Sequence, residues 1–174
     1  MIELAGVSKI YGKKKNLFTA LDDVSLSIGS GEIVAVLGKS GSGKSTLMHI
    51  MSGLDRATSG DVLVDGKNLF TMKQRDVDTF RAQRMSFIFQ SFFIQGNETC
   101  YDNVSLPLET ASVPRPRRKK MIEDALRSVG LEDKVRSKAK DLSGGQKQRL
   151  AIARAIVNNP KILILFLMIL KENS

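Results

Sequence analysis

The residues whose types and spacing most plainly suggest chemistry form one short glycine-rich segment. It reads Gly38-Lys39-Ser40-Gly41-Ser42-Gly43-Lys44-Ser45-Thr46 and fits the pattern G-x-x-x-x-G-K-[ST]. Glycines allow tight curvature, so backbone N–H groups can point inward around a polyphosphate, while Lys44 adds a positive charge at the outer phosphates. The Ser45 hydroxyl could then bind a magnesium ion.

A flexible glycine- and serine-rich linker is the alternative for this segment. The residues on either side argue against a linker. An unbroken apolar run at residues 33–37 precedes the loop and is typical of a strand buried on both faces, and residues 46–51 fit a buried helix. A phosphate-binding loop requires this order of strand, loop and helix, so we expect a nucleoside triphosphate to bind here.

A second candidate site lies much further along the chain, at Leu142-Ser143-Gly144-Gly145-Gln146. Ser143 and Gln146 match a capping box, in which each side chain bonds the backbone N–H of the other residue. A serine hydroxyl and two glycines at a helix N-terminus also make an anion site. Two phosphate-binding segments so far apart suggest a nucleotide that is shared between two subunits.

The elements that must position these segments alternate between strands and helices. The pattern predicts strands in the first thirty residues, including 23–28, then strands at 62–64, 85–89 and 162–165, and helices at 121–129 and 143–157. Gly130 ends the first of these two helices. Residues 97–112 show only weak periodicity. Alternating buried strands and helices predict a parallel α/β sheet.

Composition bounds the function without choosing it. The 174 residues suffice for one domain, or one and a part, and 27 Lys+Arg against 18 Asp+Glu give a net charge of +9. Such a charge suits an anionic ligand, a nucleic acid or an acidic membrane surface. We interpret the basic stretch 114–120 as a solvated connection rather than a nucleic-acid or lipid contact. The single cysteine, Cys100, excludes an internal disulfide and fits a reducing compartment.

No targeting or membrane segment is expected. The N-terminus lacks a basic segment followed by an apolar stretch, so we expect no signal peptide. The longest apolar run, residues 162–170, is far shorter than the roughly 20 residues of a membrane-spanning helix.

These segments together resemble the ATP-binding subunits of ABC transporters. Residues 38–46 look like the Walker A loop, and residues 142–155 look like the signature segment. Gln90 falls at the position of the family's Q-loop, and Tyr11 at the position of the aromatic residue that stacks on adenine. Further segments resemble the lipoprotein-release and peptide-export branch; they are residues 53–55, 58–60 and 103–108.

The resemblance covers residues 1 to about 165 and implies a fold. That fold is α/β, a P-loop NTPase (RecA-like) parallel sheet core with an N-terminal antiparallel β subdomain and a helical insert. Residues 1–96 and 141–166 would form the core with the β subdomain, 97–140 the helical subdomain, and 167–174 an aberrant tail. We expect the family's last strands and helices to be missing from a C-terminally truncated domain.

The resemblance also implies ATP and Mg2+ as cofactors. Ser45 and Gln90 would bind the metal, and the signature segment would contact the γ-phosphate of ATP held by the opposite subunit. The residues expected to bind nucleotide are Tyr11, Gly38, Ser40, Gly41, Ser42, Gly43, Lys44, Ser45, Thr46, Gln90, Ser143, Gly144, Gly145 and Gln146. Tyr11 as plain surface and Gln90 as an ordinary loop residue remain alternatives, and we expect His49 to serve packing rather than catalysis.

The implied partners are ATP, a second ATPase subunit and a membrane protein. The chain would form a homodimer or pair with an intact ABC ATPase subunit, and would act on a separate membrane-spanning permease. It would then be cytoplasmic and peripheral on the inner face of the cell membrane. No nucleic acid is expected as a partner.

The sequence departs from the family where its catalytic acids belong. The strand that begins at Ile162 should end in an aspartate for magnesium and a glutamate for the attacking water, but these positions hold Phe166 and Leu167. The family's switch histidine is absent as well, so no catalytic residue is assigned. We expect phosphate binding to survive, magnesium binding to weaken, and ATP hydrolysis to be slow or lost. We hypothesise that the last residues arise from a shifted reading frame or a damaged gene end.

Two functions remain open. The first is an ATP-binding subunit that couples ATP binding and hydrolysis to transport, here impaired in hydrolysis. The alternative is a non-hydrolysing fragment that binds ATP or a partner and regulates or inhibits an intact ABC subunit. An ABC-type ATPase of DNA maintenance is disfavoured because no heptads separate the two motifs. A simple P-loop kinase or GTPase would not need the second motif.

Overall fold

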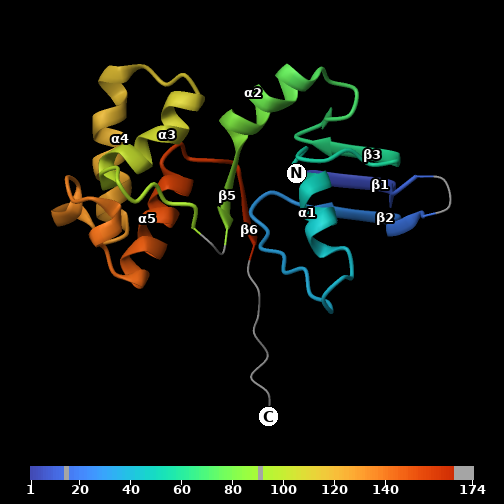
Figure 1. The fold of residues 1–174 in the computed structure, drawn as a ribbon. Coiled ribbons are helices and arrows are strands. Elements are labelled where there is room, and N and C mark those ends of the chain that lie inside the picture. Colours follow the sequence, from blue (N-terminus) through green and yellow to red (C-terminus); the bar gives the residue numbers. More distant parts are fainter. Residues whose placement is uncertain (14–15, 90–91, 167–174) are drawn as a thin grey trace, which may run out of the picture. The chain divides into compact units, whose positions relative to one another are not determined.

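The computed structural model describes residues 1–13, 16–89 and 92–166 (Figure 1). The chain divides into two compact units, Met1–Asp78 and Thr79–Ser174. The expected division, in which residues 97–140 form a subdomain apart from a core of 1–96 and 141–166, stays a prediction.

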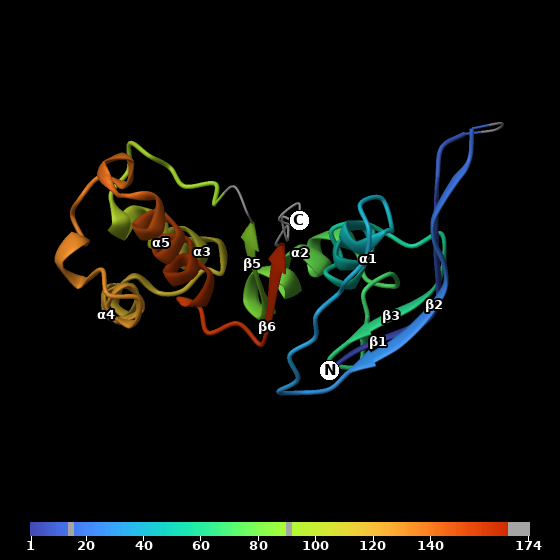
Figure 2. The ribbon, with the colours of Figure 1, turned by 90° about the horizontal axis from the view of Figure 1, so that it is seen from below.

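The first unit contains a four-stranded antiparallel sheet with the order β2-β1-β3-β4, of which Figure 2 shows the three long strands side by side. The strands are β1 Ile2–Tyr11, β2 Phe18–Ile28, β3 Ser59–Val64 and β4 Lys67–Asn68. Alternation puts Ile2 and Leu4 of β1 into the core with their neighbours Val62 and Val64 of β3. The strands expected in the first thirty residues and at 62–64 are therefore confirmed.

Helix α1, Lys44–Met51, supplies the other half of this core. Its buried side chains are Leu47, Ile50 and Met51, and the helix contacts β1, β2 and β3. This confirms the helix expected after the glycine-rich loop. A later helix, α2, spans Gln74–Arg84 and runs across the division between the two units.

The strand expected at residues 33–37 is wrong. In the structure these residues form no strand, and Val34 and Leu37 are 52% and 74% exposed. A strand buried on both faces depends on hydrogen-bonded neighbours at both edges. Among the described residues this run takes part in no ladder, so its apolar composition alone does not make it a strand.

The second unit holds a pair of parallel strands, β5 Met85–Phe89 and β6 Ile162–Phe166, which lie side by side in both views (Figures 1 and 2). Their register runs from Met85 opposite Ile162 to Phe89 opposite Phe166. Both strands and their parallel direction were expected from the sequence and are confirmed.

Three helices form the main hydrophobic cluster of this unit. They are α3 Cys100–Thr110, α4 Arg115–Ser128 and α5 Gly144–Ile156, with short 3-10 turns at Glu132–Lys134 and Ala139–Asp141. Leu108, Ile122, Leu126 and Leu150 are fully buried between them. The helices expected at 121–129 and 143–157 are present as α4 and α5. The interpretation of residues 114–120 as a connection is wrong for most of that stretch, because α4 begins at Arg115. Within the described residues, no helix is long and apolar enough to cross a membrane.

Helix α3 was not predicted from the sequence, although its start carries a signal. The Thr99 hydroxyl accepts a hydrogen bond from the Asp102 backbone, and the Asp102 carboxylate accepts one from the Thr99 backbone. This is a capping box of the kind recognised at Ser143. Pro107 lies inside the helix and weakens its sequence pattern.

Candidate functional site

The glycine-rich loop leads directly into α1, and the N-terminus of that helix is open. Gly43 is the N-cap residue, so no side chain bonds the first helical N–H groups, and no acidic residue lies in the first turn. Four backbone N–H groups at a helix start lack partners within the helix and carry partial positive charge. The arrangement is that of an anion site.

Two glycines of the loop are required by its backbone. Gly41 and Gly43 have φ angles of +80° and +82°, which lie in the left-handed region that side chains disfavour. At Gly43 an added Cβ would also lie 2.4 Å from the backbone oxygen of Ala20 in β2, whereas at Gly41 nothing lies within 4 Å. The loop thus needs glycine for conformation at both positions, and for close approach to the sheet at Gly43.

Lys44 turns back onto the loop. Its Nζ donates to the backbone oxygens of Gly38 and Lys39 at 2.8 and 2.6 Å, and lies 3.5 Å from the Ser42 hydroxyl. The ammonium group of Lys44 therefore hydrogen-bonds to two backbone carbonyls of the loop at once. Ser45 lies next to it and is exposed, with its hydroxyl available to a metal ion that arrives with a ligand.

Tyr11 lies at the end of β1 and is held by neighbours of the same unit. Its hydroxyl donates to Asp55 Oδ2 at 2.7 Å, and the Lys9 ammonium lies over its ring, 4.7 Å from the centroid. Burial and the hydrogen bond to Asp55 raise the pKa of Tyr11, while a hydrogen bond with the Thr46 side chain opposes the shift. Tyr11 and Thr46, both expected in the site, are therefore neighbours.

The second motif forms the start of α5. Ser143 is the N-cap, its backbone N–H donates to Gln146 Oε1 at 2.9 Å, and the Gln146 backbone N–H donates to Ser143 Oγ at 3.3 Å. The expected capping box is thus present. A Cβ on Gly144 or Gly145 would meet nothing within 4 Å. Glycine destabilises a helix by roughly 1 kcal/mol relative to alanine. Because there is room for a side chain at both positions, packing within the chain does not explain the two glycines.

Three positions were singled out around the metal ion and the attacking water, namely Gln90, Phe166 and Leu167. Gln90 and Leu167 lie outside the described residues. Phe166 ends β6, where its ring stacks on that of Phe89. Among the described residues, no group of three or more His, Cys, Asp or Glu side chains could hold a metal ion.

Arg154 of α5 was not recognised from the sequence. Its guanidinium donates to the backbone oxygens of Phe92 and Phe93, the latter at 2.8 Å, and burial lowers its pKa. Phe92 and Phe93 have positive φ angles, so the arginine holds a strained segment close to Gln90 in the sequence. The same segment borders a cavity of about 240 Å³ lined by Phe92, Ile94, Gly96, Ala139, Lys140 and Lys147.

Lys9 and Asp55 were missed as well. Lys9 is two residues before Tyr11, so both side chains lie on one face of β1, a relation that strand alternation could have indicated. Nothing local in the sequence points to Asp55, which is 44 residues from Tyr11.

The family model described as ABC transporter matches residues 21–165. The methionine import ATP-binding protein MetN of Halalkalibacterium halodurans is 44% identical over 164 residues, which are 94% of this chain and 48% of that protein. The methionine import ATP-binding protein MetN of Geobacillus kaustophilus is 43% identical over 164 residues, which are again 94% of this chain and 48% of that protein. The chain spans about half the length of the curated relatives it matches.

Solved structures give the same family. The dimeric structure of MJ0796, a bacterial ABC transporter cassette, matches with a TM-score of 0.83 and 37% identity, over 95% of this chain and 73% of that chain. These relatives are importers or cassettes by name, so the lipoprotein-release and peptide-export branch expected from residues 53–55, 58–60 and 103–108 stays a prediction. The expected α/β fold of the P-loop NTPase type is confirmed, and the chain belongs to the ABC transporter family.

Proposed function

We propose that this chain binds ATP together with Mg2+ and is the ATP-binding part of an ABC transporter. The observation that carries the proposal is the start of α1. There the Lys44 ammonium bonds two carbonyls of the preceding loop, and no side chain caps the helix N-terminus. A triphosphate offers Lys44 better acceptors than neutral carbonyls, because its oxygens carry negative charge and add a Coulombic attraction to the hydrogen bond with the ammonium. ATP would therefore draw the ammonium from the loop carbonyls to its outer phosphates.

Magnesium would be held by Ser45 and Gln90 together with the phosphates. Mg2+ prefers oxygen ligands and is usually bound through substrate phosphates and few protein groups. The metal supplies charge neutralisation at the β- and γ-phosphates. Because Phe166 offers no carboxylate, magnesium would be bound more weakly than in a site with an acid there.

A second subunit would complete the site. Gly144 and Gly145 leave the start of α5 bare, which suits close approach of a phosphate from outside the chain. The dimeric form of the MJ0796 cassette supports this arrangement. The dimer would be formed with a second copy or with an intact ABC ATPase subunit.

Transport would require a separate membrane permease, through which this subunit would lie on the inner face of the cell membrane. The names of the relatives favour import of a small molecule such as methionine over export. A non-hydrolysing fragment that regulates or inhibits an intact subunit is the second candidate, and the aromatic side chain at position 166 favours it.

Isothermal titration calorimetry with ATP, with and without Mg2+, tests the proposal. We expect binding by the unaltered chain and an affinity loss of roughly ten- to a hundredfold in Lys44→Ala, the range expected for one charge-assisted hydrogen bond. Lys39→Ala is the matched control, because it removes a nearby loop charge whose side chain is exposed. Absence of binding heat, or equal losses in the two variants, would contradict the proposal.

A further inference from the structure

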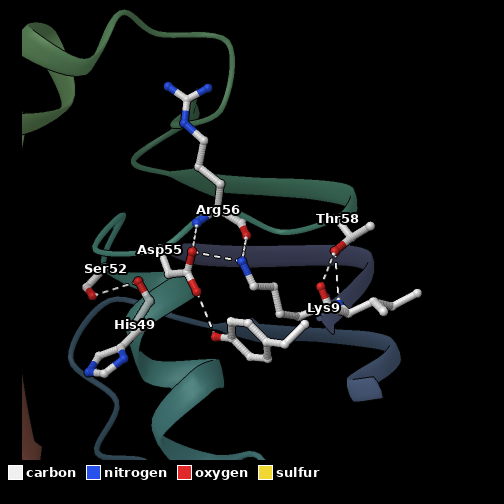
Figure 3. Close-up of polar contacts among 8 residues, drawn as sticks. Lys9, His49, Ser52, Asp55, Arg56 and Thr58 are labelled. Carbon is white, nitrogen blue, oxygen red and sulfur yellow. Dashed lines mark hydrogen bonds and ion pairs between the residues drawn. The ribbon is translucent and has the colours of Figure 1, made fainter. Parts of the chain in front are cut away.

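Three side chains of the first unit meet beside α1. The Lys9 ammonium donates to Asp55 Oδ1 at 2.8 Å and to the backbone oxygen of Arg56 at 2.7 Å, and Tyr11 donates to the other oxygen of the same carboxylate. Figure 3 shows Lys9 and Asp55 facing each other. The Lys9 side chain is only 13% exposed and that of Asp55 is 32% exposed. A single carboxylate thus joins the lysine and the tyrosine.

Asp55 is itself fixed to the C-terminal end of α1. Its backbone N–H donates to the His49 oxygen at 3.2 Å, and the Leu54 N–H donates to the same oxygen at 2.8 Å. The Ser52 hydroxyl donates to the Met48 oxygen at 2.8 Å and to the His49 oxygen at 3.0 Å, the second of which Figure 3 shows, and these bonds close the last turn. The helix that begins at the phosphate loop is therefore hydrogen-bonded, through its last turn, to the residue whose carboxylate binds Tyr11.

The segment after Asp55 is also tied to the end of β1. The Ile10 backbone N–H donates to the Thr58 hydroxyl at 2.9 Å, and the Thr58 N–H donates to the Ser8 oxygen at 2.8 Å. These bonds join the segment after Asp55 to the end of β1, so Tyr11 and Asp55 are held opposite each other. The position of the tyrosine relative to α1 is therefore set from both sides.

An exposed tyrosine ring would otherwise rotate freely. Tyr11 is 39% exposed, and ordering such a side chain on binding has an entropic cost. The hydroxyl bond to Asp55 fixes the far end of the ring, and the Lys9 ammonium occupies one face. A flat ligand can then stack only on the other face.

We propose that Asp55 and Lys9 are positioning residues that hold the Tyr11 ring ready to stack on the base of the nucleotide and tie it to α1. The inference rests on the proposed function, because it assumes that ATP is the ligand. It means that base recognition and phosphate recognition are separable, since the carboxylate and Lys9 act on the base side and the glycine-rich loop on the phosphate side.

The test compares ATP with inorganic tripolyphosphate, which has the phosphates but no base. Titrations use the unaltered chain, Asp55→Ala, Lys9→Met, Tyr11→Phe and the double variant Asp55→Ala/Tyr11→Phe. We expect each single variant to bind ATP roughly two- to tenfold more weakly, which matches the ordering of one side chain. Tripolyphosphate affinity should stay within twofold. The double variant should lose no more than Asp55→Ala alone, because the only bond that Tyr11→Phe removes, Tyr11 to Asp55, is already absent in Asp55→Ala.

Asp61→Ala is the matched control, because it removes a carboxylate from β3 that bonds Asn68 instead. It should change neither affinity. Equal losses for ATP and tripolyphosphate, or unchanged ATP binding in Asp55→Ala, would overturn the inference while leaving the proposed function intact. If the unaltered chain bound neither ligand, the proposed function would fail, and the inference with it.

Discussion

The rings of Phe89 and Phe166 stack, with centroids 5.0 Å apart and planes inclined by 12°. The two residues are partners in the parallel ladder of β5 and β6. Phe87 and Phe93 extend the cluster, with their centroids 6.0 and 5.4 Å from that of Phe89. The resemblance places a magnesium-binding aspartate at position 166. In this chain Phe166 takes the place of that aspartate, and its ring packs against Phe89 of the neighbouring strand β5.

We predict that the chain binds ATP without turning it over. With a phenyl ring at position 166, no carboxylate there balances the charge of the metal and phosphates. Phosphate release at saturating ATP and Mg2+ should equal that of the Lys44→Ala variant, which controls for contaminating ATPases. Release that depends on Lys44 would show that the residues present suffice for catalysis.

We predict that Phe89 and Phe166 stabilise the second unit as a pair. Stacked aromatic side chains contribute about 0.5–1.5 kcal/mol beyond their burial. In a cycle of Phe89→Leu, Phe166→Leu and the double variant, urea unfolding should reveal a coupling free energy of that size. Strictly additive losses would mean that the rings act through burial alone.

We predict different stability losses for two loop glycines with the same conformation. Gly41→Ala should lower the free energy of unfolding by about 1 kcal/mol, because only its φ angle of +80° opposes a side chain. Gly43→Ala should cost more, typically a further 1–3 kcal/mol, because its Cβ would collide with the Ala20 oxygen. Urea denaturation of both variants measures the difference, and equal losses would argue against the close contact with β2.

We predict that stability and association separate at the start of α5. Ser143→Ala should lower the free energy of unfolding by about 1 kcal/mol through loss of the cap. Gly144→Ala should leave it unchanged or raise it by up to about 1 kcal/mol, because its Cβ meets open space. The same alanine should weaken ATP-dependent self-association, measured by sedimentation. A stable Gly144→Ala variant that associates normally would count against a ligand approaching this surface.

We predict that Asp55 makes stability depend on acid. Burial raises its pKa, but the hydrogen bonds from Lys9 and Tyr11 outweigh burial and hold the pKa below its ordinary value. The carboxylate therefore stabilises the folded state above about pH 4, and this contribution is lost as the pH falls through the lowered folded-state pKa. Urea midpoints measured from pH 7 to 3 should fall less steeply in Asp55→Asn. If the urea midpoint of Asp55→Asn fell with pH as steeply as that of the unaltered chain, groups other than Asp55 would cause the acid sensitivity.

Local patterns were sufficient for much of the fold. The strands at 85–89 and 162–165 and the helix start at Ser143 follow from interactions within a few residues, namely alternation, propensity and capping. The glycine-rich loop is also local, because its left-handed glycines and its lysine bond lie within seven residues of one another.

The run at residues 33–37 shows where local patterns fail. Its composition is that of a buried strand, but a strand also needs a partner backbone, and composition cannot say whether one is present. The helix α3 was missed for the opposite reason, since Pro107 obscured a helix that packing and a capping box stabilise.

By itself the sequence determined the family, the phosphate-binding loop and the capped second motif, because each of these is encoded in contiguous residues. Only the tertiary structure decided that Asp55 binds Tyr11 and Lys9, and that Arg154 binds the backbone at Phe93, because 44 and 61 residues separate the partners Asp55–Tyr11 and Arg154–Phe93. Such pairs form when the path of the backbone brings a donor and an acceptor together in a partly buried place where each needs a partner. That path is a property of the whole unit, and no short segment carries it.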